Sequence, residues 1–176
     1  MADRTARQDG RLRRGRIVGF SLALMVLLAD QAAKYVVRDL LELQTRRDID
    51  VFPFFTLRWV ENRGVSMGLL TAGSETARWL LVALTAAISL FVSYWLWRER
   101  RGDDAVALGL VLGGALGNIL DRMRFGYVVD FADLHFGDIH PFLVFNVGDA
   151  AITIGVLLLL VRALLTRERK APEEDK

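Results

Sequence analysis

Two aspartates in the second half of the chain are surrounded as a catalytic acid pair would be. Asp130 is enclosed by Val128, Val129 and Phe131, and Asp149 is flanked by valine, glycine and alanine. Two carboxyl groups brought together in a medium of low dielectric constant cannot both ionise easily. One then keeps its proton while the other acts as a base, which is how an aspartic protease activates water for attack on a peptide carbonyl. This pair is our candidate catalytic site, and its chemistry requires no metal and no cofactor.

Other polar side chains gather near these two aspartates along the chain. Asn118, Asp121 and Arg122 precede the pair, and Asn146 stands three positions before its second member. Because Asp121 and Arg122 are adjacent, we predict a local structural ion pair between them.

A second acid–base pair lies in the first apolar run. Asp30 and Lys34 are four residues apart with the acid first, an order that suits an ion pair on one helix face. Ionisable groups inside a membrane span are costly, so each needs a reason to be there. We interpret this pair as orienting its helix without chemistry of its own, with Lys34 extending outward to the membrane surface.

Two other functions remain open on these residues alone. Two membrane aspartates could instead bind a cation or relay protons, so a small ion or proton transporter is one alternative. Residues 64–68 match G-x-S-x-G, which makes Ser66 the candidate nucleophile of an intramembrane serine protease. That motif works between a strand and a helix of a soluble α/β sheet, which this chain cannot supply. The possible bases, His135 and His140, lie in a different connection.

A cluster of histidines and aspartates in the last connection could bind a metal weakly; it consists of Asp133, His135, Asp138 and His140. The glycine and proline in this segment favour a solvated surface turn instead, and we predict no metal site. The chain has no cysteine and no HExxH motif. Disulfides, thiolate metal sites and zinc peptidases built on that motif are therefore excluded.

Membrane-spanning helices must position these residues. The chain has 176 residues, 53% of them hydrophobic, and its charges fall in blocks between long apolar runs, as in polytopic membrane proteins. We predict an all-α membrane protein with four transmembrane helices at about 17–37, 79–97, 105–122 and 142–165. The first is long enough, at ~31 Å, to cross a bilayer. A cleavable signal peptide is the alternative for this run, but no convincing A-x-A site follows it.

The connections between the helices differ in character. Within connection 38–78, residues 49–60 are rich in β-branched and aromatic residues and predict one or two short strands broken at Pro53. We predict an irregular loop over 121–141. If the last helix begins near residue 142, Asp149 sits ~10 Å along it. A glycine at every fourth position of the third helix predicts close helix packing; these are Gly109, Gly113 and Gly117.

The distribution of lysine and arginine predicts the orientation in the membrane. The tail 1–16, which we expect to be flexible, holds six arginines and loop 98–104 holds three, whereas 121–141 holds two. The positive-inside rule then places both termini, including the polar tail 166–176, in the cytoplasm. The two longer connections face outward, so the acid pair would lie near the outer leaflet within a peptidase domain spanning 17–165. The net charge of +2 gives no reason to expect a nucleic-acid partner.

Five short motifs in this order resemble those of the signal peptidase II family, also called lipoprotein signal peptidases. They are Asp30-Gln31-x-x-Lys34, Asn62-x-Gly64-x-Ser66, Gly117-Asn118-x-x-Asp121-Arg122, Val129-Asp130-Phe131 and Asn146-x-Gly148-Asp149. Each motif is weak alone, but five in order within a four-span chain of this length are specific. The resemblance covers about residues 17–165.

The resemblance implies a bacterial inner-membrane endopeptidase. Such enzymes remove signal peptides from diacylglyceryl-modified prolipoproteins and cut just before the lipidated cysteine. We expect a monomer that contacts membrane lipids and needs no cofactor. The family's catalytic positions match Asp130 and Asp149, and the predicted strands would form the small sheet that cradles the substrate. The matching positions that line or support the site are Asp30, Lys34, Asn62, Gly64, Asn118, Asp121, Arg122 and Asn146. Gly148 departs from the family, which commonly has alanine at this position. Because glycine is smaller and more flexible, it leaves the orientation of the Asp149 side chain open.

Overall fold

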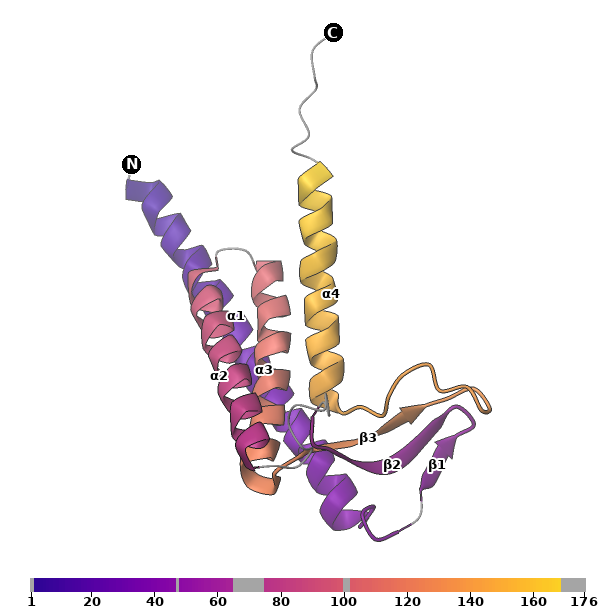
Figure 1. Cartoon of the computed structure of the whole chain (residues 1–176). Helices are drawn as coiled ribbons and strands as arrows, with labels where there is room; N and C mark the ends of the chain where they lie inside the picture. The colour runs from indigo at the N-terminus through magenta and orange to yellow at the C-terminus, as the bar shows by residue number, and fades with distance from the viewer. Residues whose placement is uncertain (1, 47, 65–74, 100–101, 169–176) are drawn as a thin grey trace.

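Four long helices make up most of the part of the chain that the structure describes. The computed structural model describes residues 2–46, 48–64, 75–99 and 102–168. The helices lie alongside one another in Figure 1, and α3 packs against the other three. Each contains a stretch long and apolar enough to cross a membrane, which confirms the predicted four-helix membrane fold. Their bounds are α1 Ala2–Tyr35, α2 Glu75–Arg98, α3 Gly102–Phe125 and α4 Val147–Glu168.

The ends of the first helix differ from the prediction. Helix α1 already begins at Ala2, so the expectation of a flexible tail over 1–16 is wrong for the residues described there. Arginine, a good helix former, is the commonest residue in this segment, with six of its 16 positions. At its other end α1 continues into a π-helical turn, η1, over Val36–Leu40.

The last helix begins later than predicted. Residues 142–146 lie outside α4, which starts at Val147. The backbone of Phe145 is instead paired with Ala132, in both directions, at N···O distances of 2.8 and 3.0 Å. This pairing holds the chain extended up to the start of the helix. Asp149 therefore lies in the first turn of α4, and the predicted position ~10 Å along the helix is wrong.

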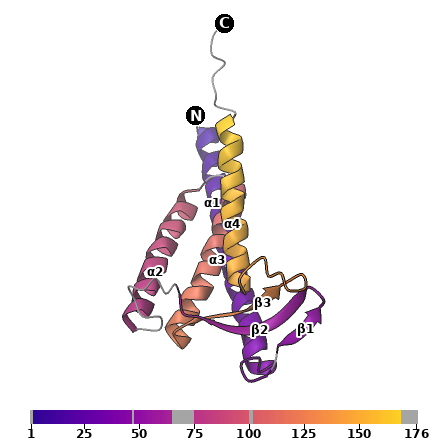
Figure 2. The ribbon, with the colours of Figure 1, turned by 45° about the vertical axis from the view of Figure 1, so that its right-hand side comes forward.

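A three-stranded antiparallel sheet lies at the end of the bundle opposite the start of α1 and the end of α4 (Figures 1 and 2). The predicted strands near Pro53 are confirmed as β1 Ile49–Phe52 and β2 Phe55–Asn62. The third strand, β3 Val128–Leu134, falls in the segment predicted as a loop, so that prediction is wrong. Strand β2 pairs with β3 from Phe55 opposite Leu134 to Asn62 opposite Val128.

The glycine face of α3 allows α1 to approach closely, as predicted. A Cβ atom at Gly109 would lie 2.5 Å from the carbonyl oxygen of Gly19, and one at Gly113 would lie 2.5 Å from that of Ala23. A Cβ atom at Gly117 would collide with the carboxylate of Asp30. The packing of α1 against α3 therefore requires glycine at these three positions. This packing brings the polar residues of the two helices into contact.

Candidate active site

Lys34 lies between two buried carboxylates at the ends of α1 and α3 nearer the sheet. Its Nζ atom is 2.8 Å from Asp30 Oδ2 and 2.7 Å from Asp121 Oδ2, and the three side chains are at most 5% exposed. The ion pair between Asp30 and Lys34 is confirmed, but Lys34 does not extend to the surface. The pairing predicted for Asp121 with Arg122 is wrong, because Asp121 takes Lys34 as its partner. A buried ammonium needs such compensation, since removing it from water is costly.

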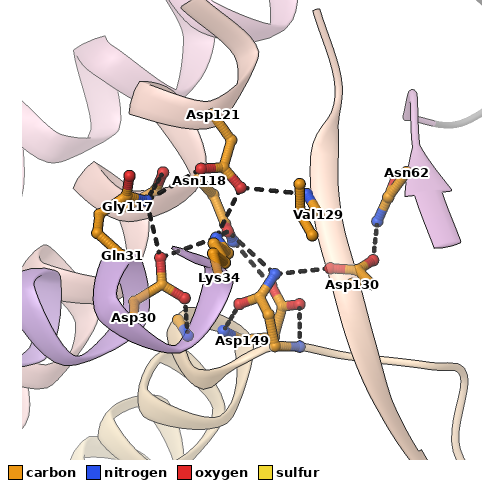
Figure 3. Close-up of polar contacts among 12 residues, drawn as sticks. Asp30, Gln31, Lys34, Asn62, Gly117, Asn118, Asp121, Val129, Asp130 and Asp149 are labelled. Carbon is orange, nitrogen blue, oxygen red and sulfur yellow. Dashed lines mark hydrogen bonds and ion pairs between the residues drawn. The ribbon is translucent and has the colours of Figure 1, made fainter. Parts of the chain in front are cut away.

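This buried group fixes the elements that carry the candidate aspartates (Figure 3). Asp121 accepts a hydrogen bond of 3.1 Å from the backbone N–H of Val129 on β3. Asp30 accepts one of 2.9 Å from the backbone N–H of Gly148 in the first turn of α4. The two carboxylates that neutralise Lys34 thus also position β3 and α4 relative to α1 and α3.

Asp130 is buried on β3 and receives hydrogen bonds from two amides. Asn62 Nδ2 on β2 donates to its Oδ2 at 3.0 Å, and Asn146 Nδ2 donates to its Oδ1 at 2.6 Å. Burial and the charge of Asp149 raise the pKa of Asp130 to about 6, against the lowering effect of these two amides and Lys34. The side chain is therefore protonated more readily than an ordinary aspartate.

Asp149 forms a reciprocal cap with Asn146 at the start of α4. Its backbone N–H donates to Asn146 Oδ1 at 2.9 Å, and its Oδ2 accepts from the backbone N–H of Asn146 at 3.2 Å. This is the geometry of a capping box, which satisfies backbone donors that a helix end leaves free. Asn118 Nδ2 on α3 donates to the other carboxylate oxygen at 2.8 Å.

The structure brings Asp130 and Asp149 together through one residue. Asn146 donates from its side chain to Asp130 and from its backbone to Asp149, and its amide also donates to Asn118 Oδ1 at 3.2 Å. Figure 3 shows the two carboxylates on facing elements, β3 and α4. Two acids in this arrangement can share a proton and act on one water molecule.

The remaining predicted site residues lie around this pair. Gly64 adopts φ +91°, and its N–H donates to Asn62 Oδ1 at 3.0 Å, which leaves the amide nitrogen of Asn62 to donate to Asp130. The Nε atom of Arg122 is buried and has no hydrogen-bond partner among the described residues. Ser66, the alternative nucleophile, lies outside the residues that the structure describes.

The histidine and aspartate cluster lies at the far end of β3. Asp133 is 1% exposed and pairs with Arg58 at 3.2 Å and with His140 Nδ1 at 2.9 Å, so the prediction of a solvated turn is wrong for this residue. His135 bonds to the hydroxyl of Thr56 at 2.9 Å. No group of three or more possible metal ligands occurs within the described part of the chain.

Sequence reasoning missed the capping role of Asn146. An asparagine three residues before an acid and ahead of a long apolar run is an N-cap signal, and it was present in the sequence. The apolar residues that precede Asn146 obscured it, because they extend the hydrophobic run to residue 142.

Comparison with known proteins gives a consistent result. The family model described as signal peptidase (SPase) II matches residues 22–165. A lipoprotein signal peptidase of Rhizorhabdus wittichii is 60% identical over 160 residues, 91% of this chain and 93% of the relative. One of Sphingopyxis alaskensis is 49% identical over 158 residues, 90% and 91% of the two chains. A solved bacterial membrane enzyme superposes with a TM-score of 0.73 at 28% identity, covering 90% of this chain and 94% of that one. The chain therefore belongs to the signal peptidase II family.

Proposed function

We propose that Asp130 and Asp149 are the catalytic pair with which this aspartic endopeptidase removes signal peptides from prolipoproteins. The observation that carries the proposal is that both carboxylates bond to the same residue, Asn146, from two different elements. Family membership fixes the reaction class, and it sets aside the serine-protease and transporter hypotheses. The assignment of the two aspartates rests on their geometry and on their match to the family's motifs.

The surroundings of the two carboxylates suggest which one acts as base. Asp149 accepts hydrogen bonds from two N–H donors, the side-chain amide of Asn118 and the backbone of Asn146. Burial raises the pKa of Asp130 to about 6 and favours its protonated form. We therefore assign Asp149 as the base that deprotonates water. Asp130 is the acid that polarises the peptide carbonyl and then protonates the leaving amine.

An apolar groove that begins at Asp149 supports a lipid-embedded substrate. It measures about 300 Å³ and runs between the loop before α4 and the exposed face of that helix. Its lining residues besides Asp149 are Leu134, Phe142, Leu143, Phe145, Ala150, Thr153 and Ile154. Acyl chains packed in this groove would keep its apolar surface away from water, which lowers the free energy. We propose that the precursor is diacylglyceryl-modified and is cut just before its lipidated cysteine.

The proposed orientation places this site near the outer leaflet of the bacterial inner membrane. The start of α1 and the end of α4 lie at the end of the bundle away from the sheet (Figure 1). The arginine-rich first turns of α1 favour the cytoplasm under the positive-inside rule. The acid pair at the opposite end would then face the secretion side, where lipid-modified precursors are anchored.

A cleavage assay on a diacylglyceryl-modified precursor tests the pair. Asp130→Asn and Asp149→Asn should each lower turnover by at least ~100-fold, because an amide cannot exchange the required proton. Asp133→Asn is the matched control, since it changes another buried carboxyl on the same strand outside the site. It should keep its activity provided that thermal unfolding shows a folded protein. Near-normal turnover in either site variant would defeat the assignment, and equal cleavage of an unmodified precursor would refute the lipid requirement.

A further inference from the structure

Large apolar side chains stand exposed where the sheet extends away from the bundle. They come from the β1–β2 turn and from the loop between β3 and α4. We call this set the apolar tip; its members, 48% to 91% exposed, are Phe52, Phe54, Phe136, Ile139, Phe142 and Leu143. A protein surface in contact only with water rarely gathers so many large apolar residues.

Hydrogen bonds and ring packing hold these side chains outward. Phe136 and Ile139 exchange two backbone hydrogen bonds, of 2.9 and 3.2 Å, around a turn in which Gly137 has φ +61°. Phe52 and Phe54 stack with ring centroids 5.6 Å apart and planes 9° from parallel. The exposure of the apolar tip is thus a property of ordered, paired backbone.

The two parts of the tip form one surface that continues onto α4. The backbone N–H of His135 donates to the carbonyl of Phe54 at 3.1 Å, which joins the β1–β2 turn to the end of β3. Phe142 and Leu143 share the apolar groove with Ile154 of α4. Beyond Ile154 the same helix exposes a run of apolar side chains of a membrane span, including Leu157, Leu158 and Val161.

The partner that fits this surface is the lipid beside α4. We propose that the apolar tip inserts into the boundary between headgroups and acyl chains of the outer leaflet and holds the sheet against the membrane. Figures 1 and 2 show the sheet and the β3–α4 loop projecting sideways from the base of α4, the position such a contact requires. Insertion stops at the boundary, because exposed backbone and the carboxylate of Asp138 between Phe136 and Ile139 are too polar for the hydrocarbon.

This contact would fix the depth of the candidate site. Asp121 holds the start of β3 through the backbone N–H of Val129, and part of the apolar tip lies beyond the end of this strand. Asp130 lies between these two points. Support at both ends prevents the strand from tilting away from the membrane. The inference goes beyond the proposed function and rests only on its orientation, which places the sheet at the outer leaflet.

Spin labels on single cysteines test the contact, since the chain contains no cysteine of its own. Phe136→Cys and Leu143→Cys place labels on the tip, and Leu158→Cys on α4 is the lipid reference. Arg46→Cys, whose native side chain is 62% exposed at the same end of the molecule, is the aqueous control. Each protein is reconstituted in vesicles of phosphatidylethanolamine and phosphatidylglycerol. Collisions with oxygen and with a nickel chelate are then compared, because oxygen concentrates in lipid and the chelate in water.

We expect oxygen collisions to exceed nickel collisions at 136 and 143, as at 158, with the reverse at 46. Nickel-dominated labels at both tip positions would overturn the proposal. Labels shielded from both reagents would indicate a protein partner or a second copy instead. Lipid-like behaviour that appears only after a lipidated precursor is added would make the substrate the occupant. Phe54→Cys repeats the measurement on the other part of the tip. Precursor cleavage by the proteins labelled at 54 and 136, which lie outside the apolar groove, separates failure here from failure of the proposed function.

Discussion

Asn146 is the residue at which the candidate site can be disturbed most selectively. Its side chain caps α4 through Oδ1 and holds Asp130 through Nδ2. Serine keeps an oxygen that can cap the helix, but it is too short to bring an amide donor to Asp130. Alanine removes both functions. The pair Asn146→Ser and Asn146→Ala therefore separates the cap from the contact with the acid.

The size of each effect follows from these contacts. Because Asp130 is the protonated acid of the proposed pair, its bond with the Asn146 amide, at 2.6 Å, joins two neutral groups and contributes about 0.5–1.5 kcal/mol. If this bond holds Asp130 in its reactive position, its loss should lower kcat/KM roughly 2- to 13-fold. Loss of the cap should lower the free energy of unfolding by about 1 kcal/mol.

Precursor cleavage and thermal unfolding of the purified protein check the two effects separately. Both variants should lose cleavage in the range given, whereas only Asn146→Ala should lose the stability of the cap. A serine variant that cleaves at the native rate would refute the role of the amide in holding Asp130. Equal stability of the two variants would refute the capping role.

Three further changes test the charges and the packing around the site. A raised folded-state pKa makes the ionised form of Asp130 unfavourable, so its contribution to stability falls as pH rises from about 4 to about 6. Asp130→Asn should therefore abolish cleavage and remove this fall, so its unfolding temperature should depend less on pH between 4 and 7 than that of the unmodified protein; an unchanged pH dependence would contradict the pKa argument. Lys34→Met leaves two buried carboxylates without their cation and should lower the free energy of unfolding by about 3–5 kcal/mol. The matched change Arg38→Met, in a more exposed ion pair of 2.8 Å, should cost at most about 1 kcal/mol, and equal losses in the two would count against the buried network. Gly148→Ala places its Cβ at 3.0 Å from its nearest neighbours and should be tolerated in unfolding assays, whereas Gly114→Ala collides with the carbonyl oxygen of Gly148 and should destabilise the protein strongly. The reverse order would show that α3 and α4 can separate at this contact.

The elements that depend on local sequence could be predicted. An apolar run of sufficient length predicts each transmembrane helix, and most of the predicted ends lie within a few residues of the observed ones. The exception is the start of α1, which begins at Ala2 and not at residue 17. Strands β1 and β2 were found because residues 49–60 are rich in β-branched and aromatic residues around Pro53. The two candidate aspartates stood out because carboxylates among apolar neighbours are rare without a reason.

The features that depend on distant contacts could not be read from the sequence. Strand β3 is interrupted by Asp130 and Asp133, which spoils its pattern, and pairing with β2 is what makes it a strand. The sequence predicts an ion pair of Asp121 with its neighbour Arg122. The true partner, Lys34, is within reach only because α1 and α3 pack closely at Gly117. No local spacing encodes that distance.

The same close packing governs the charge of the site. Four aspartates meet at the sheet end of the bundle, and Lys34 forms ion pairs with two of them, Asp30 and Asp121. The side chain of Arg122 adds positive charge near Asp149, Asp130 and Asp121. Burial and the negative charge of Asp149 nevertheless raise the pKa of Asp130 to about 6, so Asp130 keeps its proton to a higher pH than an isolated aspartate. In the mechanism proposed above the acid pair must hold one proton, and the ion pairs that position β3 and α4 bring the two carboxyls together for this.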